Sequence, residues 1–116
     1  MTTSAIETLI NEYMAAWNEA NATSRQQILA RIWADDGRYT DPQSDGQGRD
    51  ALNQIIGGFH QTAPGSSFSL HGNIEYHHNY IRFAGKLKLP DGSTVHGMDF
   101  GEVTDDNRLS RIVGFF

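Results

Sequence analysis

An α+β fold is predicted for this chain of 116 residues by a change in the spacing of its apolar residues. Up to about residue 61 they recur every three or four positions, as in amphipathic helices. From Ser67 onward they alternate with polar residues, as in strands. Three helices followed by a meandering antiparallel sheet define the α+β class. We therefore expect three N-terminal helices packed on a curved, mixed but mainly antiparallel sheet that forms a cone with an apolar pocket.

The length and composition limit the kinds of protein that this chain can be. A chain of 116 residues is large enough for one core and too small for two, so we expect a single domain over residues 1–116. Its net charge of −5 and the lack of a basic block argue against binding to nucleic acid or to an anionic membrane. There is no cysteine, no signal-peptide pattern and no apolar run long enough to span a bilayer. We expect a cytoplasmic protein.

The first two helices are each marked by a capping-box pattern. Ser4 and Glu7 have this spacing for a helix that should end near Asn21, and Ser24 and Gln27 have it for a shorter one. The expected buried stripes are Ile6, Ile10, Tyr13 and Trp17 on the first helix, and Ile28, Leu29, Ile32 and Trp33 on the second.

The segment from Trp33 to Pro42 connects the second helix to the sheet. Gly37 suits the position after a helix, and the two acids before it should be solvated at the helix end. Residues 38–40 favour a strand, and Pro42 pushes Asp41 toward the extended region. Asp41 would then lie where a strand meets the interior, and it would be the proton-accepting base in the pocket. The alternative is an ordinary turn-forming aspartate.

The remaining elements follow from turn signals. We expect a loop or hairpin over 43–48 and a third helix from Arg49 to about Gln61. The expected strands cover residues 67–76, 80–89, 94–104 and 109–116, with turns at 77–79, 90–93 and 105–107.

The strand from Val95 to Val103 carries a second unusual acid. Alternation places Asp99 on the same face as two valines and two glycines. If it is buried without a cation, its pKa should rise, and a neutral carboxylic acid can donate a hydrogen bond. The alternative is a structural pair with Arg82 on the neighbouring strand.

Tyr13 lies on the buried stripe of the first helix, so its hydroxyl must find a partner or face a cavity. Together, Tyr13, Asp41 and Asp99 would supply one carboxylate base and two donors. That set can remove a proton next to a carbonyl group and stabilise the resulting enolate.

Four aromatic residues are expected to give the pocket flat apolar walls suited to a ring-containing ligand. They are Trp17, Trp33, Phe59 and Phe83. The five histidines lack the spacing of metal ligands, so we expect no metal and no cofactor.

The chain resembles the nuclear transport factor 2-like superfamily over almost its whole length. The likeness rests on Tyr-Met-Ala-Ala-Trp-Asn at 13–18, Trp-Ala-Asp-Asp-Gly-Arg-Tyr-Thr-Asp-Pro at 33–42 and Met-Asp-Phe-Gly-Glu-Val at 98–103. That superfamily includes ketosteroid isomerases and SnoaL-like polyketide cyclases. The resemblance implies that Asp41 is the base and that Tyr13 and Asp99 form the oxyanion hole.

The expected function is therefore proton transfer on a small apolar carbonyl compound, with isomerase or polyketide cyclase chemistry. The alternative is a domain of the same fold that binds a small molecule without turning it over. The resemblance also implies a homodimer. The sheet face is the expected interface, because Tyr80, Phe100, Phe115 and Phe116 cannot all point inward.

Overall fold

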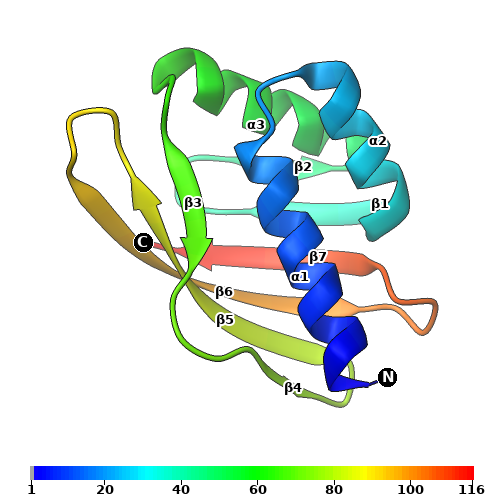
Figure 1. Ribbon diagram of the computed structural model, residues 1–116. Helices are drawn as coiled ribbons and strands as arrows, with labels where there is room; N and C mark the ends of the chain where they lie inside the picture. The colour runs from blue at the N-terminus through cyan, green and yellow to red at the C-terminus, as the bar shows by residue number, and fades with distance from the viewer. Residues whose placement is uncertain (1) are drawn as a thin grey trace.

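The computed structural model describes residues 2–116, and its helices lie against one face of a curved sheet (Figure 1). The helices are α1 (Thr3–Asn18), α2 (Ala22–Ile32) and α3 (Arg49–Thr62). The strands are β1 (Trp33–Thr40), β2 (Asp45–Gln47), β3 (Ser67–Leu70), β4 (Glu75–His77), β5 (Tyr80–Lys88), β6 (Thr94–Val103) and β7 (Leu109–Phe115). The predicted α+β class, with three helices on a mainly antiparallel sheet, is confirmed for this part of the chain.

The strand order determines which residues meet. The sheet runs β2-β1-β7-β6-β5-β3, with β4 pairing separately with β5. All pairs are antiparallel except β1 and β7, which run parallel. Because β7 separates β1 from β6, the end of β1 lies one strand away from the middle of β6.

The helices begin at other caps than the sequence predicted. The Thr2 hydroxyl accepts a hydrogen bond from the Ala5 amide at 3.1 Å, and the Asn21 side chain accepts one from Ser24 at 2.9 Å. The predicted capping boxes are therefore wrong, because threonine and asparagine earlier in the chain satisfy the first free amides. α1 also ends before Asn21, at Asn18, whose side chain instead bonds both backbone groups of Phe68.

The predicted helix end at Gly37 is also wrong. β1 begins directly after α2, at Trp33, and Gly37 lies within the strand without a positive φ. The glycine is required for space: a Cβ there would lie 2.5 Å from Nε1 of Trp33. That indole nitrogen donates to the Gly37 carbonyl at 3.2 Å. The pairing with β7 shifts register between Trp33 and Arg38, which bends the strand around the indole.

In the second half of the chain the predicted strands and turns are largely confirmed. The turns at 77–79, 90–93 and 105–107 contain the positive-φ residues His78, Asn79, Gly92 and Asn107. The strand expected over 67–76 is two strands, β3 and β4. Gly72, with φ of 86°, breaks it.

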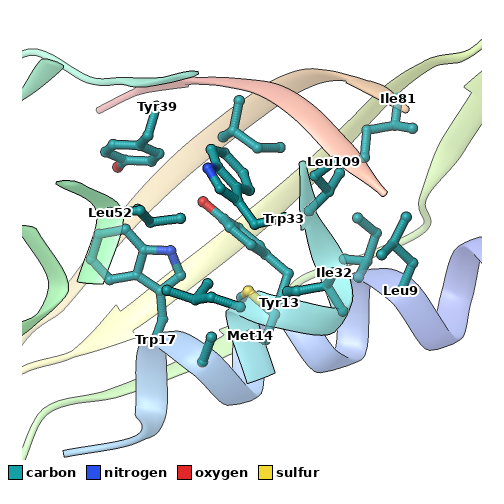
Figure 2. Close-up of a cluster of buried hydrophobic side chains, with 14 of the residues drawn as sticks. Leu9, Tyr13, Met14, Trp17, Ile32, Trp33, Tyr39, Leu52, Ile81 and Leu109 are labelled. Carbon is teal, nitrogen blue, oxygen red and sulfur yellow. The ribbon is translucent and has the colours of Figure 1, made fainter. Parts of the chain in front are cut away.

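The core fills the space between the helices and one end of the sheet. Figure 2 shows Leu9 and Ile32 against Ile81 and Leu109 at this end, with Tyr13 and Trp17 further along α1. None of the helices within residues 2–116 combines the length and apolar character needed to cross a membrane.

Candidate active site

A cavity of about 760 Å³ lies between α1, α3 and the sheet, at the opposite end from the closed core. Three of the predicted catalytic residues line it, namely Tyr13, Asp41 and Asp99, and so do the predicted wall residues Trp17 and Phe59. Its other apolar lining residues are Met14, Ile55, Phe68, Leu87, Val95, Phe115 and Phe116. The elements therefore bring an acid–base cluster and a largely apolar wall into one space.

Trp33 and Phe83, which the sequence analysis placed in the cavity wall, instead belong to the core. They are 0% and 1% exposed and do not line the cavity. The Trp33 ring stacks on Tyr13 with centroids 6.1 Å apart, and Phe83 meets Tyr13 edge-on at 6.2 Å. Trp33 begins a strand instead of ending a helix, which turns its indole behind Tyr13. These two aromatics support Tyr13 from behind and have no access to a ligand.

Asp41 follows β1 directly, and both of its carboxylate oxygens accept hydrogen bonds. The Tyr39 hydroxyl donates to Oδ2 at 2.6 Å, and the Gln43 amide donates to Oδ1 at 2.8 Å. The Asp41 amide in turn donates to the Ser44 carbonyl at 2.9 Å, which closes a turn. Asp41 is thus both a turn residue and a cavity residue, so the two interpretations of it are compatible.

Asp99 projects from the middle of β6 into the same cavity. Burial raises its pKa to about 7, and the nearby negative charge of Asp41 contributes to the rise. The alternative pairing with Arg82 does not form, because Arg82 pairs with Glu75 at 2.8 Å. With its pKa near neutrality, Asp99 can be a carboxylic acid and a hydrogen-bond donor at ordinary pH.

Gly114 on β7 lies between the two acids. A Cβ at this position would lie 2.9 Å from Oδ1 of Asp99 and 3.5 Å from Cβ of Asp41. Any side chain there would press on the Asp99 carboxyl. The glycine therefore lets the acids approach each other across β7.

Tyr13 is 1% exposed and comes from the middle of α1. Burial raises its pKa well above the ordinary tyrosine value, and the charge of Asp99 adds to this. The Trp17 side chain opposes the rise, and the charge of Asp41 makes a smaller contribution to it. The phenol is therefore neutral and can donate. Figure 2 shows Tyr13 and Trp17 rising from the same helix toward Trp33 and Tyr39.

Two glycines form the floor of the cavity next to Asp99. Gly85 on β5 pairs with Gly97 on β6, two residues along each strand from the pair of Phe83 and Asp99. Neither glycine has a positive φ, so the backbone conformation does not require them. A glycine inside a strand often marks close approach by a ligand or by another part of the chain. A Cβ at Gly97 would lie 3.3 Å from the Phe115 carbonyl oxygen, so this pair leaves room for the C-terminal strand as well as for a ligand.

Tyr39 is the site residue that the sequence analysis missed. It was treated only as a residue that favours a strand, yet it is 5% exposed, lines the cavity and bonds Asp41. The two-residue period of a strand places Tyr39 and Asp41 on one face. That alternation could have identified the pair.

The described side chains of the site provide a carboxylate, a carboxyl group that can be neutral at ordinary pH, and two neutral phenols. Together they can accept a proton and stabilise an oxyanion. Within residues 2–116, no three His, Cys, Asp or Glu side chains are grouped as metal ligands are.

Helices over a curved sheet, with a cavity between the layers, define a nuclear transport factor 2-like protein. The chain belongs to the SnoaL-like domain family, which matches residues 10–112. The resemblance inferred from the sequence is thereby confirmed. Comparison with curated proteins gives no match.

Three solved structures illustrate the relationship. A protein of Agrobacterium tumefaciens, described as a proposed isomerase of the SnoaL-like family, is 33% identical with a TM-score of 0.90, and 97% of each chain is covered. A proposed polyketide cyclase of Sinorhizobium meliloti is 17% identical with a TM-score of 0.75, over 92% of this chain and 93% of that one. A protein of Catenulispora acidiphila with a ketosteroid isomerase-like fold, solved with trimethylamine, is 11% identical with a TM-score of 0.79, over 93% and 84%. The last two likenesses concern the fold alone.

Proposed function

We propose that this protein is a proton-transfer enzyme that needs no cofactor and acts on a small, apolar, ring-containing carbonyl compound. One observation carries the proposal: the Asp41 carboxylate, the Asp99 carboxyl and the Tyr13 phenol line one cavity whose walls are otherwise mainly apolar. A base and two donors in an apolar cavity are suited to enolate chemistry, because a low-dielectric site strengthens their electrostatic effects.

In the proposed reaction Asp41 removes a proton from the carbon next to the carbonyl group. The electron pair of the broken C–H bond moves into the new carbon–carbon double bond, and the carbonyl oxygen becomes an enolate. Tyr13 and Asp99 donate hydrogen bonds to that oxygen. In an isomerisation, Asp41 returns the proton to another carbon of the same molecule. In a cyclisation, the enolate carbon attacks a second carbonyl carbon of the substrate, the π electrons of that C=O bond move to its oxygen, and this oxygen takes the proton from Asp41.

The relatives support this reaction class. The Agrobacterium protein, which shares 33% of its residues with this chain, is described as a proposed isomerase. A structurally similar Sinorhizobium protein is described as a proposed polyketide cyclase. Both reactions can begin with proton removal next to a carbonyl group, which is the step that the cavity residues are suited to.

The test is conversion of a β,γ-unsaturated ketosteroid to the conjugated enone, followed by ultraviolet absorbance. We expect Asp41→Asn to lower the rate by about 10²–10⁴-fold, the usual contribution of a general base. Asp36→Asn is the matched control, because Asp36 is exposed on β1 and does not line the cavity. Full activity of Asp41→Asn would show that another group is the base. No turnover by the wild type would reject the steroid isomerase reaction.

A second candidate is a domain that binds a small molecule without turnover. The two hydrogen bonds to Asp41 favour it, since they occupy both carboxylate oxygens with donors from the protein itself. In that case the ketosteroid would bind, with a change in Trp17 fluorescence, and its absorbance spectrum would stay constant.

We also propose that two copies associate through the outer face of the sheet, as the superfamily resemblance implies. Tyr80 and Phe100 stack on that face with centroids 5.7 Å apart, and they are 44% and 38% exposed. An exposed apolar pair can meet its own copy across a two-fold axis. Light scattering should give a dimer mass for the wild type and for the control Gln47→Ser, and a monomer mass for Phe100→Ser. A monomeric wild type would reject the dimer.

A further inference from the structure

The Tyr39 hydroxyl is placed to fix the orientation of the Asp41 carboxyl. It donates to Oδ2 at 2.6 Å, while the Gln43 amide holds Oδ1 at 2.8 Å. A carboxyl held at one oxygen can still turn about both side-chain torsions of the aspartate, the three-fold Cα–Cβ torsion and the broad Cβ–Cγ torsion. Held at both oxygens, it has one orientation. Each oxygen keeps a second lone pair, so the carboxyl can still accept a proton.

The Tyr39 ring is itself fixed. It is 5% exposed, and its centroid lies 5.4 Å from that of Trp17. The Trp17 backbone carbonyl lies 2.8 Å from Nε2 of His60, a contact that ties α1 to α3. The ring that carries the hydroxyl is therefore held between its own strand, β1, and Trp17 of α1.

Gly114 leaves room for this arrangement on the β7 side. A Cβ there would lie 3.7 Å from the Tyr39 oxygen, 3.5 Å from Cβ of Asp41 and 2.9 Å from Oδ1 of Asp99. Tyr39, Asp41 and Asp99 thus surround one glycine.

The Tyr39 hydroxyl keeps its proton under ordinary conditions. Burial raises the pKa of Tyr39 well above its usual value, and Tyr13 and the hydrogen bond to Asp41 raise it further. The titratable groups that line the cavity from the packed elements are Tyr13 on α1, Lys86 on β5 and Asp99 on β6. Lys86 is the one basic residue among these three, so the described lining offers little positive charge that would favour the ionised form of Tyr39.

We infer that Tyr39 is a positioning residue, whose phenol holds the Asp41 carboxyl in the single orientation from which it exchanges a proton with the substrate. The inference rests on the proposed function in that Asp41 is the base. The contact itself can be tested without turnover. It predicts a specific kinetic pattern, because a misplaced base slows the chemical step while the cavity still binds the ligand.

The first experiment is solution NMR of the full chain. In the wild type we expect a slowly exchanging hydroxyl proton from Tyr39, and Hα–Hβ couplings of Asp41 that correspond to one rotamer. Tyr39→Phe keeps the ring and should remove the hydroxyl signal and average the couplings. Tyr76→Phe is the matched control, because its hydroxyl bonds Asn79 away from the cavity. Unchanged Asp41 couplings in Tyr39→Phe would overturn the inference. Should that variant fail to fold, the hydroxyl signal must still disappear in Asp41→Ala, which removes the acceptor, and its persistence would overturn the inference.

The second experiment is the ketosteroid assay. We expect Tyr39→Phe to lower kcat about tenfold or more while KM stays within about twofold, as loss of positioning requires. A kcat equal to or above the wild-type value would mean that the hydroxyl does not position the base, and would overturn the inference. If the wild type does not turn over this steroid, the proposed function fails for it, and the NMR couplings alone decide the role of Tyr39.

Discussion

The two ends of the helix–sheet interface are built from the same layers, yet one is filled and the other is hollow. At the filled end Ile10, Leu29 and Leu109 are completely buried against one another. At the hollow end Gly85, Gly97 and polar side chains line a cavity of about 760 Å³. The same fold thus supplies a close-packed support and an open site.

Tyr13 belongs to both ends. Its ring is packed against Trp33 and Phe83, while it also lines the cavity. The filled end therefore holds the donor of the hollow end in place. The difference between the ends predicts that substitutions in the first change stability, and that those in the second change ligand binding or pH response.

The largest effect is expected at the filled end. Trp33→Ala removes a completely buried indole and leaves a cavity, which should lower the free energy of unfolding by about 3–5 kcal/mol. Urea denaturation measures this loss. Phe116→Ala, at a residue that is 60% exposed, is the control. A loss below about 1 kcal/mol for Trp33→Ala would mean that this end is not close-packed.

The next effect is the pH dependence that Asp99 gives to stability. Its pKa is about 7 in the folded protein, against about 3.9 for an unfolded aspartate. The folded state therefore binds more protons between these values, and the free energy of unfolding should fall as pH rises from about 4 to about 7. The fall can reach about 4 kcal/mol.

Urea denaturation across this pH range checks the sign. Asp99→Asn should lose this fall, while Asp36→Asn should keep it. Parallel pH curves for the wild type and Asp99→Asn would contradict a raised pKa for Asp99.

A smaller stability effect, with a clear effect on binding, is expected for the glycine floor. A Cβ on Gly85 would lie 3.6 Å from Cε of Met14, an ordinary contact. Gly85→Val should change the free energy of unfolding by less than about 1 kcal/mol, because valine favours strands. It should raise KM for the ketosteroid about tenfold or more, because the valine side chain would fill part of the cavity that the ligand needs. His96→Val is the control and should leave KM unchanged, because His96, the residue before Gly97 on β6, is exposed and does not line the cavity. Equal KM values for both variants would mean that the floor does not contact the ligand.

The smallest effect is expected for the surface pair of Arg82 and Glu75. Its side chains are 56% and 63% exposed, so Arg82→Ala should cost less than about 1 kcal/mol. The same denaturation experiment measures it. A larger loss would point to a role for Arg82 in packing at the outer face.

Much of this organisation could be predicted from the sequence. Periodicity identified the three helices, and turn residues such as Gly92 and Asn107 fixed the strand connections. The strand alternation put Asp99 on the face of β6 that lines the cavity, and the buried stripe of α1 included Tyr13, which lines it too. These features are local, so spacing along the chain is enough to find them.

The errors arose where a distant contact decides the local structure. Trp33 has the spacing of a helix residue, but pairing with Leu109 makes it the first residue of β1. Its indole consequently turns into the core. Gly37 looked like a helix stop, and it is required because the same indole lies over it. The pairing with Leu109 has no signal in the residues that surround Trp33.

The position of β7 in the sheet also fixes the order in which the site can form. This strand follows all the others in the chain, yet it lies between β1, which leads into Asp41, and β6, which carries Asp99. The two acids cannot face each other until Leu109–Phe115 has inserted between those strands. Such long-range pairing is slow compared with helix formation. A newly synthesised chain can therefore form its helices early, but it has no complete site until its last strand has left the ribosome.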